Sequence, residues 1–149
     1  MNIGITSDHR GFKTKQKLTE YLTKKGYDVI DFGPNTSESV DYPDYAFKLC
    51  EAIINKEIIY GIAICGSGIG MSIACNKVKG IRCAKVSDSV EAKITRIDND
   101  ANVVTFSSDI CMIEAKDIVD NFLLTNFSNE ERHARRIEKI SKYEEEHEC

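Results

Sequence analysis

The chain has 149 residues, 42% of them hydrophobic and 30% charged, and a formal net charge of −4 at pH 7. Its length fits one domain, which we expect to span residues 1–149, and its apolar fraction is enough for a full core. The acidic balance disfavours a nucleic-acid partner, which usually needs a basic patch, and no apolar run reaches the ~18 residues that span a membrane.

The N-terminus and the cysteines favour a cytoplasmic protein. The start, MNIGITSDHRGF, has strand character and lacks the basic region and apolar stretch of a signal peptide. The cysteines form no C-x-x-C pair and no metal-ligand spacing, so we interpret them as reduced thiols and predict no metal site. They are Cys50, Cys65, Cys75, Cys83, Cys111 and Cys149.

Short apolar runs bounded by turn residues predict β-strands. In chain order these strands cover residues 3–7, 27–32, 59–65, 81–86 and 102–106. The run at 59–65 is apolar without alternation, which is typical of a strand buried on both faces of a parallel sheet.

Helical patterns follow the first three strands. Apolar residues three and four positions apart predict a helix over 12–25, which Gly26 can end. Asp44 is expected to cap the second helix, and the third resumes at Met71 after a run of glycines. Strands that alternate with helices imply a parallel α/β sheet.

Three further helices are predicted. Asp88 and Glu91 resemble a capped start of the fourth helix, and Ser128 and Glu131 resemble a capping box before the last. The fourth is expected to bury Val90, Ile94 and Ile97. The fifth carries an apolar stripe of Ala115, Ile118, Val119, Phe122 and Leu123.

The last helix has a narrow apolar stripe, Ile137, Ile140 and Tyr143, and is otherwise charged. Its end, 143–149, is expected to be frayed and solvent-facing. Such a helix should pack against little of its own domain, and we expect it to lie across a partner subunit.

A glycine turn, Gly66-Ser67-Gly68-Ile69-Gly70, separates the third strand from its helix. Glycines let the backbone turn tightly and approach a ligand, and the first N–H groups of a helix favour an anion. The turn could belong to a dinucleotide fingerprint, with Asp88 on the ribose, but its third glycine comes one position too early. A smaller phosphorylated or anionic ligand fits this short turn better.

Cys65 closes the apolar strand directly before that turn. Most cysteines in such a place belong to the core. A thiol beside a helix N-terminus is, however, stabilised as the reactive thiolate. Both interpretations of Cys65 stay open on spacing alone, whereas Cys75, inside the following helix, is expected to be a packing residue.

Polar clusters follow the strands and should converge, because parallel sheets bind ligands beyond their carboxyl ends. These clusters are Asp8-His9, residues 65–70, Ser87-Asp88 and residues 107–109. Farther along, Arg132 and Arg136 share one helix face, which suits a phosphate. The alternative is a solvated basic face that the neighbouring glutamates balance.

Six blocks of the sequence, in order, then carry a resemblance. They are SDHRG (7–11), SVDYP (39–43), ICGSGIG (64–70), ACNK (74–77), NDANV (99–103) and ERHARRI (131–137). Together they resemble ribose-5-phosphate isomerase B and its wider family of galactose- and allose-6-phosphate isomerases. The resemblance implies a Rossmann-like three-layer α/β sandwich with a five-stranded parallel sheet and a C-terminal helix. It also implies a homodimer with shared active sites and no metal, nucleotide or other cofactor.

The resemblance further implies an aldose–ketose isomerase that interconverts ribose 5-phosphate and ribulose 5-phosphate through an enediolate. Cys65 matches the family's base, and Ser67 matches a hydroxyl that moves a proton between O1 and O2. The family's anion hole matches the backbone N–H groups of Gly66, Ser67, Gly68, Ile69 and Gly70. Sugar and phosphate contacts match Asp8, His9 and Asn99, and the phosphate-binding arginines match Arg132 and Arg136.

The chain departs from the family at two positions. The family's Arg-x-His-Asn-Asp reads Arg96-Ile97-Asp98-Asn99-Asp100 here, so Asp98 replaces the His that opens the furanose ring. The family's Gly-x-Arg reads Ser107-Ser108-Asp109, and this carboxylate should repel a dianionic phosphate. Arg10, Lys85 and Arg135 are candidate compensating cations. The alternatives are an isomerase of another phosphosugar, such as allose or galactose 6-phosphate, or a catalytically weakened member that serves as a binding subunit.

Overall fold

The computed structural model describes residues 1–147, and in it five parallel strands form one sheet in the order β2-β1-β3-β5-β4. The strands are β1 (Asn2–Ser7), β2 (Asp28–Asp31), β3 (Tyr60–Cys65), β4 (Cys83–Lys85) and β5 (Val103–Ser107). The parallel sheet that the alternating pattern predicts is confirmed. The register pairs Ser7 with Ile64 and Cys65 with Ser107, so the carboxyl ends of the three central strands lie level.

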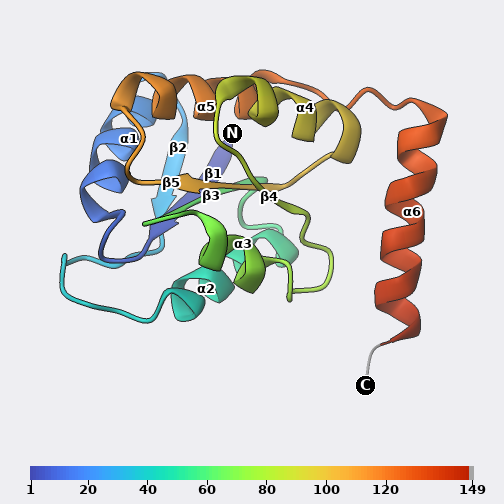
Figure 1. Cartoon of the computed structure of the whole chain (residues 1–149), viewed down its shortest axis with the longest axis horizontal. Helices are drawn as coiled ribbons and strands as arrows, with labels where there is room; N and C mark the ends of the chain where they lie inside the picture. The colour runs from blue at the N-terminus through green and yellow to red at the C-terminus, as the bar shows by residue number, and fades with distance from the viewer. Residues whose placement is uncertain (148–149) are drawn as a thin grey trace.

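Helices cover both faces of this sheet (Figure 1). One face packs against α1 (Phe12–Lys24), α4 (Ser89–Asn99) and α5 (Met112–Leu124), and the other against α2 (Tyr42–Ile54) and α3 (Ile69–Cys75). Successive side chains of β3 point to opposite faces, so Ile62 and Ile64 join the first core while Ala63 and Cys65 join the second. The three-layer α/β sandwich is therefore present, and Cys65 faces the layer of α2 and α3.

Two of the three predicted helix caps are wrong. Asp41, not Asp44, is the N-cap of α2, because the helix already begins at Tyr42 and has Pro43 in its first turn. The Ser128–Glu131 box does not form, because α6 begins only at Glu131 after a left-handed Asn129. The third cap is confirmed, since the Asp88 carboxylate accepts the Glu91 N–H at 2.8 Å.

The buried face of α4 also differs from the prediction. Val90 and Ile94 are 64% and 47% exposed, and Ile97 is half-buried; Ala92, Thr95 and Arg96 are the buried residues. The Arg96 guanidinium lies over the Tyr60 and Phe122 rings and donates to Ala101 O at 2.6 Å. An arginine with a hydrogen-bond partner at each of its three nitrogens therefore lies on the buried face of α4, which periodicity had assigned to aliphatic side chains. The stripe predicted for α5 is confirmed, because all five of its residues are buried.

The last helix, α6 (Glu131–Glu146), stands apart from the sandwich (Figure 1). His133 is its buried residue, whereas Ile140 and Tyr143 are exposed. Sparse packing on its own domain is thus confirmed, and the partner subunit stays a prediction. The stretch 143–149 is helical to Glu146, and Glu148 and Cys149 lie outside the described residues. No helix within residues 1–147 is long and apolar enough to cross a membrane.

Candidate active site

The turn after β3 holds Cys65 in a defined setting. Cys65 is buried, with 4% of its surface exposed, and its Sγ accepts the Gly68 N–H at 3.1 Å. Gly68 has φ +77°, and an added Cβ would lie 2.9 Å from the backbone of Phe106, so glycine is required there twice over. The Ile69 N–H donates to Ser67 Oγ at 3.1 Å. The turn therefore aims one backbone donor at the sulfur and another at the serine hydroxyl.

Neighbouring strands fix this turn from both sides. Ile64 O accepts the Asp8 N–H at 3.0 Å, and Cys65 O accepts the Ser108 N–H at 2.9 Å. Ser107 Oγ donates to Gly66 O at 2.6 Å. Three of the predicted polar clusters, after β1, β3 and β5, thus converge. The fourth, Ser87-Asp88, follows the edge strand β4 and is engaged in capping α4.

The segment after β1 contributes Asp8 and His9. Asp8 is buried, and its Oδ1 accepts the Gly11 N–H at 2.9 Å, which shapes the entry into α1. His9 Nδ1 accepts the Val40 N–H at 3.3 Å, which leaves the ring proton on Nε2. His9 can therefore donate to a ligand from the ring edge that faces away from the Val40 loop.

Asp98, Asn99, Arg132 and Arg136 lie at the other end of the sheet. Asp98 and Asn99 end α4, which leads into the start of β5, and Asp98 Oδ1 lies 3.4 Å from Nε2 of His133 on α6. The exposed Arg132 pairs with Glu130 at 3.0 Å, and Arg136 is also exposed. The five residues of β5 separate this group from Cys65 by roughly 15 Å at ~3.3 Å per residue. One chain therefore holds two halves of the predicted site apart.

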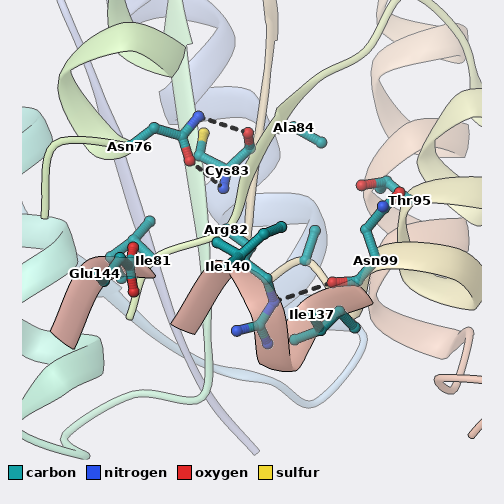
Figure 2. Close-up of a pocket in the computed structure, with 11 residues that line it drawn as sticks. Asn76, Ile81, Arg82, Cys83, Ala84, Thr95, Asn99, Ile137, Ile140 and Glu144 are labelled. Atoms are coloured by element: carbon teal, nitrogen blue, oxygen red, sulfur yellow. Dashed lines mark hydrogen bonds between the residues drawn. The ribbon is translucent and has the colours of Figure 1, made fainter. Parts of the chain in front are cut away.

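A cavity of about 430 Å³ lies at this second end, between α6 and the start of β4 (Figure 2). Asn99, Ile137, Ile140 and Glu144 line it, and Cys65 does not. Arg82 crosses it and donates to the backbone oxygens of Asn99 at 3.0 Å and Asp100 at 2.9 Å. The cavity thus lies along the middle and the second half of α6 and is separate from the turn that holds Cys65.

Sequence reasoning missed Arg82, and it gave no defined contact to His133 or to Arg10, which it offered only as a candidate compensating cation. Arg82 and His133 hold Asn99 and Asp98, and Arg10 lies beside Gly66 and 3.8 Å from Asp109. His133 belongs to the ERHARRI block, which was the signal for it, whereas Arg82 carried none. Within residues 1–147, no group of three or more His, Cys, Asp or Glu side chains is placed to hold a metal.

Comparison with known proteins gives one consistent result. The profile of the Ribose/Galactose Isomerase family matches residues 3–140. Ribose-5-phosphate isomerase B of Escherichia coli is 40% identical over 144 residues, covering 96% of each chain. A structure of ribose-5-phosphate isomerase B from Clostridium thermocellum superposes with TM-score 0.96 at 45% identity, covering 99% of this chain and 100% of that one.

A further structure carries a ligand. The Mycoplasma genitalium ribose-5-phosphate isomerase B with bound ribulose-5-phosphate superposes with TM-score 0.91 at 42% identity, covering 97% of both chains. The match spans the sheet, the glycine turn and most of α6, and its coverage of each relative is nearly complete. The chain therefore belongs to the Ribose/Galactose Isomerase family.

Proposed function

We propose that this chain interconverts ribose 5-phosphate and ribulose 5-phosphate through an enediolate, with Cys65 as the base. The observation that carries the proposal is the Cys65 sulfur beside a glycine turn that donates a backbone N–H to it at 3.1 Å. That contact gives negative charge on the sulfur a partner, as a thiolate base needs. The relatives named ribose-5-phosphate isomerase B, one of them with ribulose-5-phosphate bound, support the substrate.

In this mechanism Cys65 takes the proton from C2 of the open-chain aldose, and the electron pair of that C–H bond forms the C1–C2 double bond. The carbonyl oxygen O1 becomes negative, and backbone N–H groups of the turn other than those of Gly68 and Ile69, which Cys65 and Ser67 engage, would stabilise it. Ser67 Oγ accepts the Ile69 N–H, so its own hydrogen is free to pass to O1 while Oγ takes the proton that O2 releases as C2 becomes the carbonyl. Cys65 then returns a proton to C1, which yields the ketose without a net change in protonation.

We further propose that the active protein is a homodimer whose sites are shared. Two observations support this assembly. The second group, Asp98, Asn99, Arg132 and Arg136, is too far from Cys65 to reach the same sugar within one chain. Ile69 and Ile73 on α3 are 55% and 56% exposed, and the stripe of α6 is uncovered, so both present apolar surface to a second copy. The partner's α4 end and α6 arginines would then complete each site.

A substrate panel tests the proposal against its alternatives. Coupled assays would measure kcat/KM for ribose 5-phosphate, allose 6-phosphate and galactose 6-phosphate. We expect ribose 5-phosphate to be turned over best. A higher kcat/KM for a hexose phosphate would favour the alternative function, an isomerase of another phosphosugar. The two departures from the family's motifs, Asp98 and Asp109, are the observations that favour this alternative. Binding of all three without turnover would identify a subunit that has lost catalysis.

A further inference from the structure

Arg10 and Asp109 lie close to each other beside the glycine turn that follows Cys65 (residues 66–70). Arg10 Nη2 lies 3.8 Å from Asp109 Oδ2, and the two side chains are 60% and 75% exposed. The guanidinium lies against Gly66, where an added Cβ would come 2.5 Å from Nη1. The structure thus places an accessible cation over the first residue of the turn.

The backbone of Asp109 is anchored beside that cation. Its N–H donates to Ser107 Oγ at 3.0 Å, and the same hydroxyl donates to Gly66 O at 2.6 Å. This chain of hydrogen bonds ties the backbone of Asp109 to the turn itself. The carboxylate therefore lies where it can keep the flexible Arg10 side chain over Gly66 and not in open solvent.

We propose that Arg10 is the cation that this chain offers to the substrate's phosphate on the Cys65 side of the site, and that Asp109 positions it. The inference rests on the proposed function and specifies the substrate contact. A separation of 3.8 Å is longer than a hydrogen bond, so Asp109 consumes none of the five guanidinium N–H donors. Their planar fork stays free for two phosphate oxygens. In this proposal the phosphate binds beside the Arg10–Asp109 pair, whose charges balance, and not beside an unpaired Asp109 carboxylate.

The other candidate cations are placed elsewhere. Lys85, on the edge strand β4, donates to Ser87 Oγ at 2.9 Å, and β5 separates β4 from β3. Arg135, on α6, pairs with Glu131 at 2.8 Å at the far end of the sheet. Arg10 is therefore the member of that set which lies at the turn.

The test uses the intact chain and two readouts for ribose 5-phosphate: the steady-state kcat and KM, and the Kd from calorimetry. We expect Arg10→Gln to raise both KM and Kd roughly tenfold, because a charge-assisted hydrogen bond to phosphate is lost, while kcat changes little. Arg10→Lys should recover part of the loss. Arg135→Gln, which removes another exposed and ion-paired arginine, is the matched control and should leave KM unchanged.

A double-mutant cycle tests the role of Asp109. In the Arg10→Gln background the carboxylate is unpaired and repels the phosphate, so adding Asp109→Asn should lower KM severalfold. In the wild-type background Asp109→Asn removes both the repulsion of the phosphate by the carboxylate and the ion pair that positions Arg10. These two effects on KM oppose each other, so the net change in KM should be smaller. Equal effects in both backgrounds would overturn the pairing.

The two proposals fail separately. An unchanged KM and Kd in Arg10→Gln, in a chain that still isomerises ribose 5-phosphate, would overturn the role of Arg10 and leave the function standing. Absence of turnover by the wild type would overturn the function. The calorimetric Kd would still decide on Arg10, because it needs binding alone.

Discussion

At the scale of single residues, Cys65 differs from the other buried cysteines in what its sulfur contacts. Cys65 accepts a backbone N–H from the turn at 3.1 Å. Hydrogen bonding with Cys75 and burial raise the pKa of the Cys50 thiol well above its ordinary range, which keeps that sulfur protonated. The residue type alone does not distinguish a packing thiol from a candidate base, whereas the backbone donor beside Cys65 sets this thiol apart from Cys50.

Replacing Cys65 by Ala should abolish isomerisation. Loss of a general base typically costs ~10²–10⁴ in rate, and the remaining turn should still bind sugar phosphate. Steady-state turnover, calorimetric binding and the thermal midpoint would be measured side by side. Cys75→Ala, a buried cysteine in the adjacent helix, is the control and should lower the thermal midpoint while leaving most of the activity. Full activity in Cys65→Ala would remove Cys65 from the mechanism.

The raised pKa of Cys50 also predicts a pH dependence of stability. A thiol with a higher pKa in the folded than in the unfolded chain contributes stability that is complete below its unfolded pKa of ~8.5. That contribution is lost as pH rises beyond this value, because the unfolded chain releases the proton first. Urea unfolding between pH 7 and about 10.5 should therefore show a steeper alkaline fall for the wild type than for Cys50→Ala. Parallel curves for the two proteins would contradict the linkage.

Asp98 should limit the opening of cyclic ribose 5-phosphate. A His near neutral pH can both accept and donate a proton, whereas a carboxylate is a poor donor there. We expect Asp98→His to raise kcat from ribose 5-phosphate severalfold, with Asp98→Asn as the control. Exchange of the ribulose 5-phosphate C1 proton with solvent should change little, because that sugar enters already open. An unchanged or lower kcat would mean that Asp98, with His133 at 3.4 Å, is an adequate replacement or has no part in ring opening.

At the scale of elements, the spacing of apolar residues predicted those strands and helices whose buried faces are apolar. It placed all five strands within two residues of their observed limits and identified the buried stripe of α5. It failed on α4 because Arg96 is buried with its polar atoms partnered, which no hydrophobic pattern can express. The start of α2 could have been predicted from the sequence, since proline favours the first helical turn and Pro43 therefore indicates Asp41 as the N-cap.

Arg96 stabilises the junction between α4 and β5. Its Nη1 donates to Ala101 O at 2.6 Å and to Asp100 Oδ1 at 2.8 Å, and its Nε donates to Thr125 O at 3.2 Å. Arg96→Leu would leave the Ala101 and Thr125 carbonyls without this donor, while Asp100 keeps Arg82 at 3.4 Å, so we expect the free energy of unfolding to fall by roughly 2–4 kcal/mol. Asn99, three residues on, should shift and raise KM. Urea unfolding would measure the loss, and the exposed Arg135→Leu should change stability by no more than about 0.5 kcal/mol. A comparable, small effect of Arg96→Leu would contradict the role assigned to its hydrogen bonds.

At the scale of the whole molecule, the predicted site divides into two groups. The glycine turn, Asp8 and His9 lie at the carboxyl ends of the strands. The sequence predicted this placement, because these polar residues directly follow predicted strands. Asp98 and Asn99 lie at the opposite end because they precede β5 in a parallel sheet. The strand predicted over 102–106 already implied this placement, but the sequence argument considered only the polar residues that follow strands. Only the resemblance linked both groups to one ligand, and a second chain is the simplest way to unite them.

Mixing two inactive variants tests that union. If each site takes Cys65 from one chain and Asn99 from its partner, Cys65→Ala and Asn99→Ala homodimers are both inactive. A hybrid dimer carries one site with both residues intact, so an equal mixture that exchanges subunits freely should recover about a quarter of the wild-type activity. Cys65→Ala mixed with Ser67→Ala is the control: both substitutions fall in the same half of the site, so no hybrid is repaired. Light scattering that shows a monomer at micromolar concentration, or equal recovery in both mixtures, would contradict shared sites and return Asp98 and Asn99 to a structural role in their own chain.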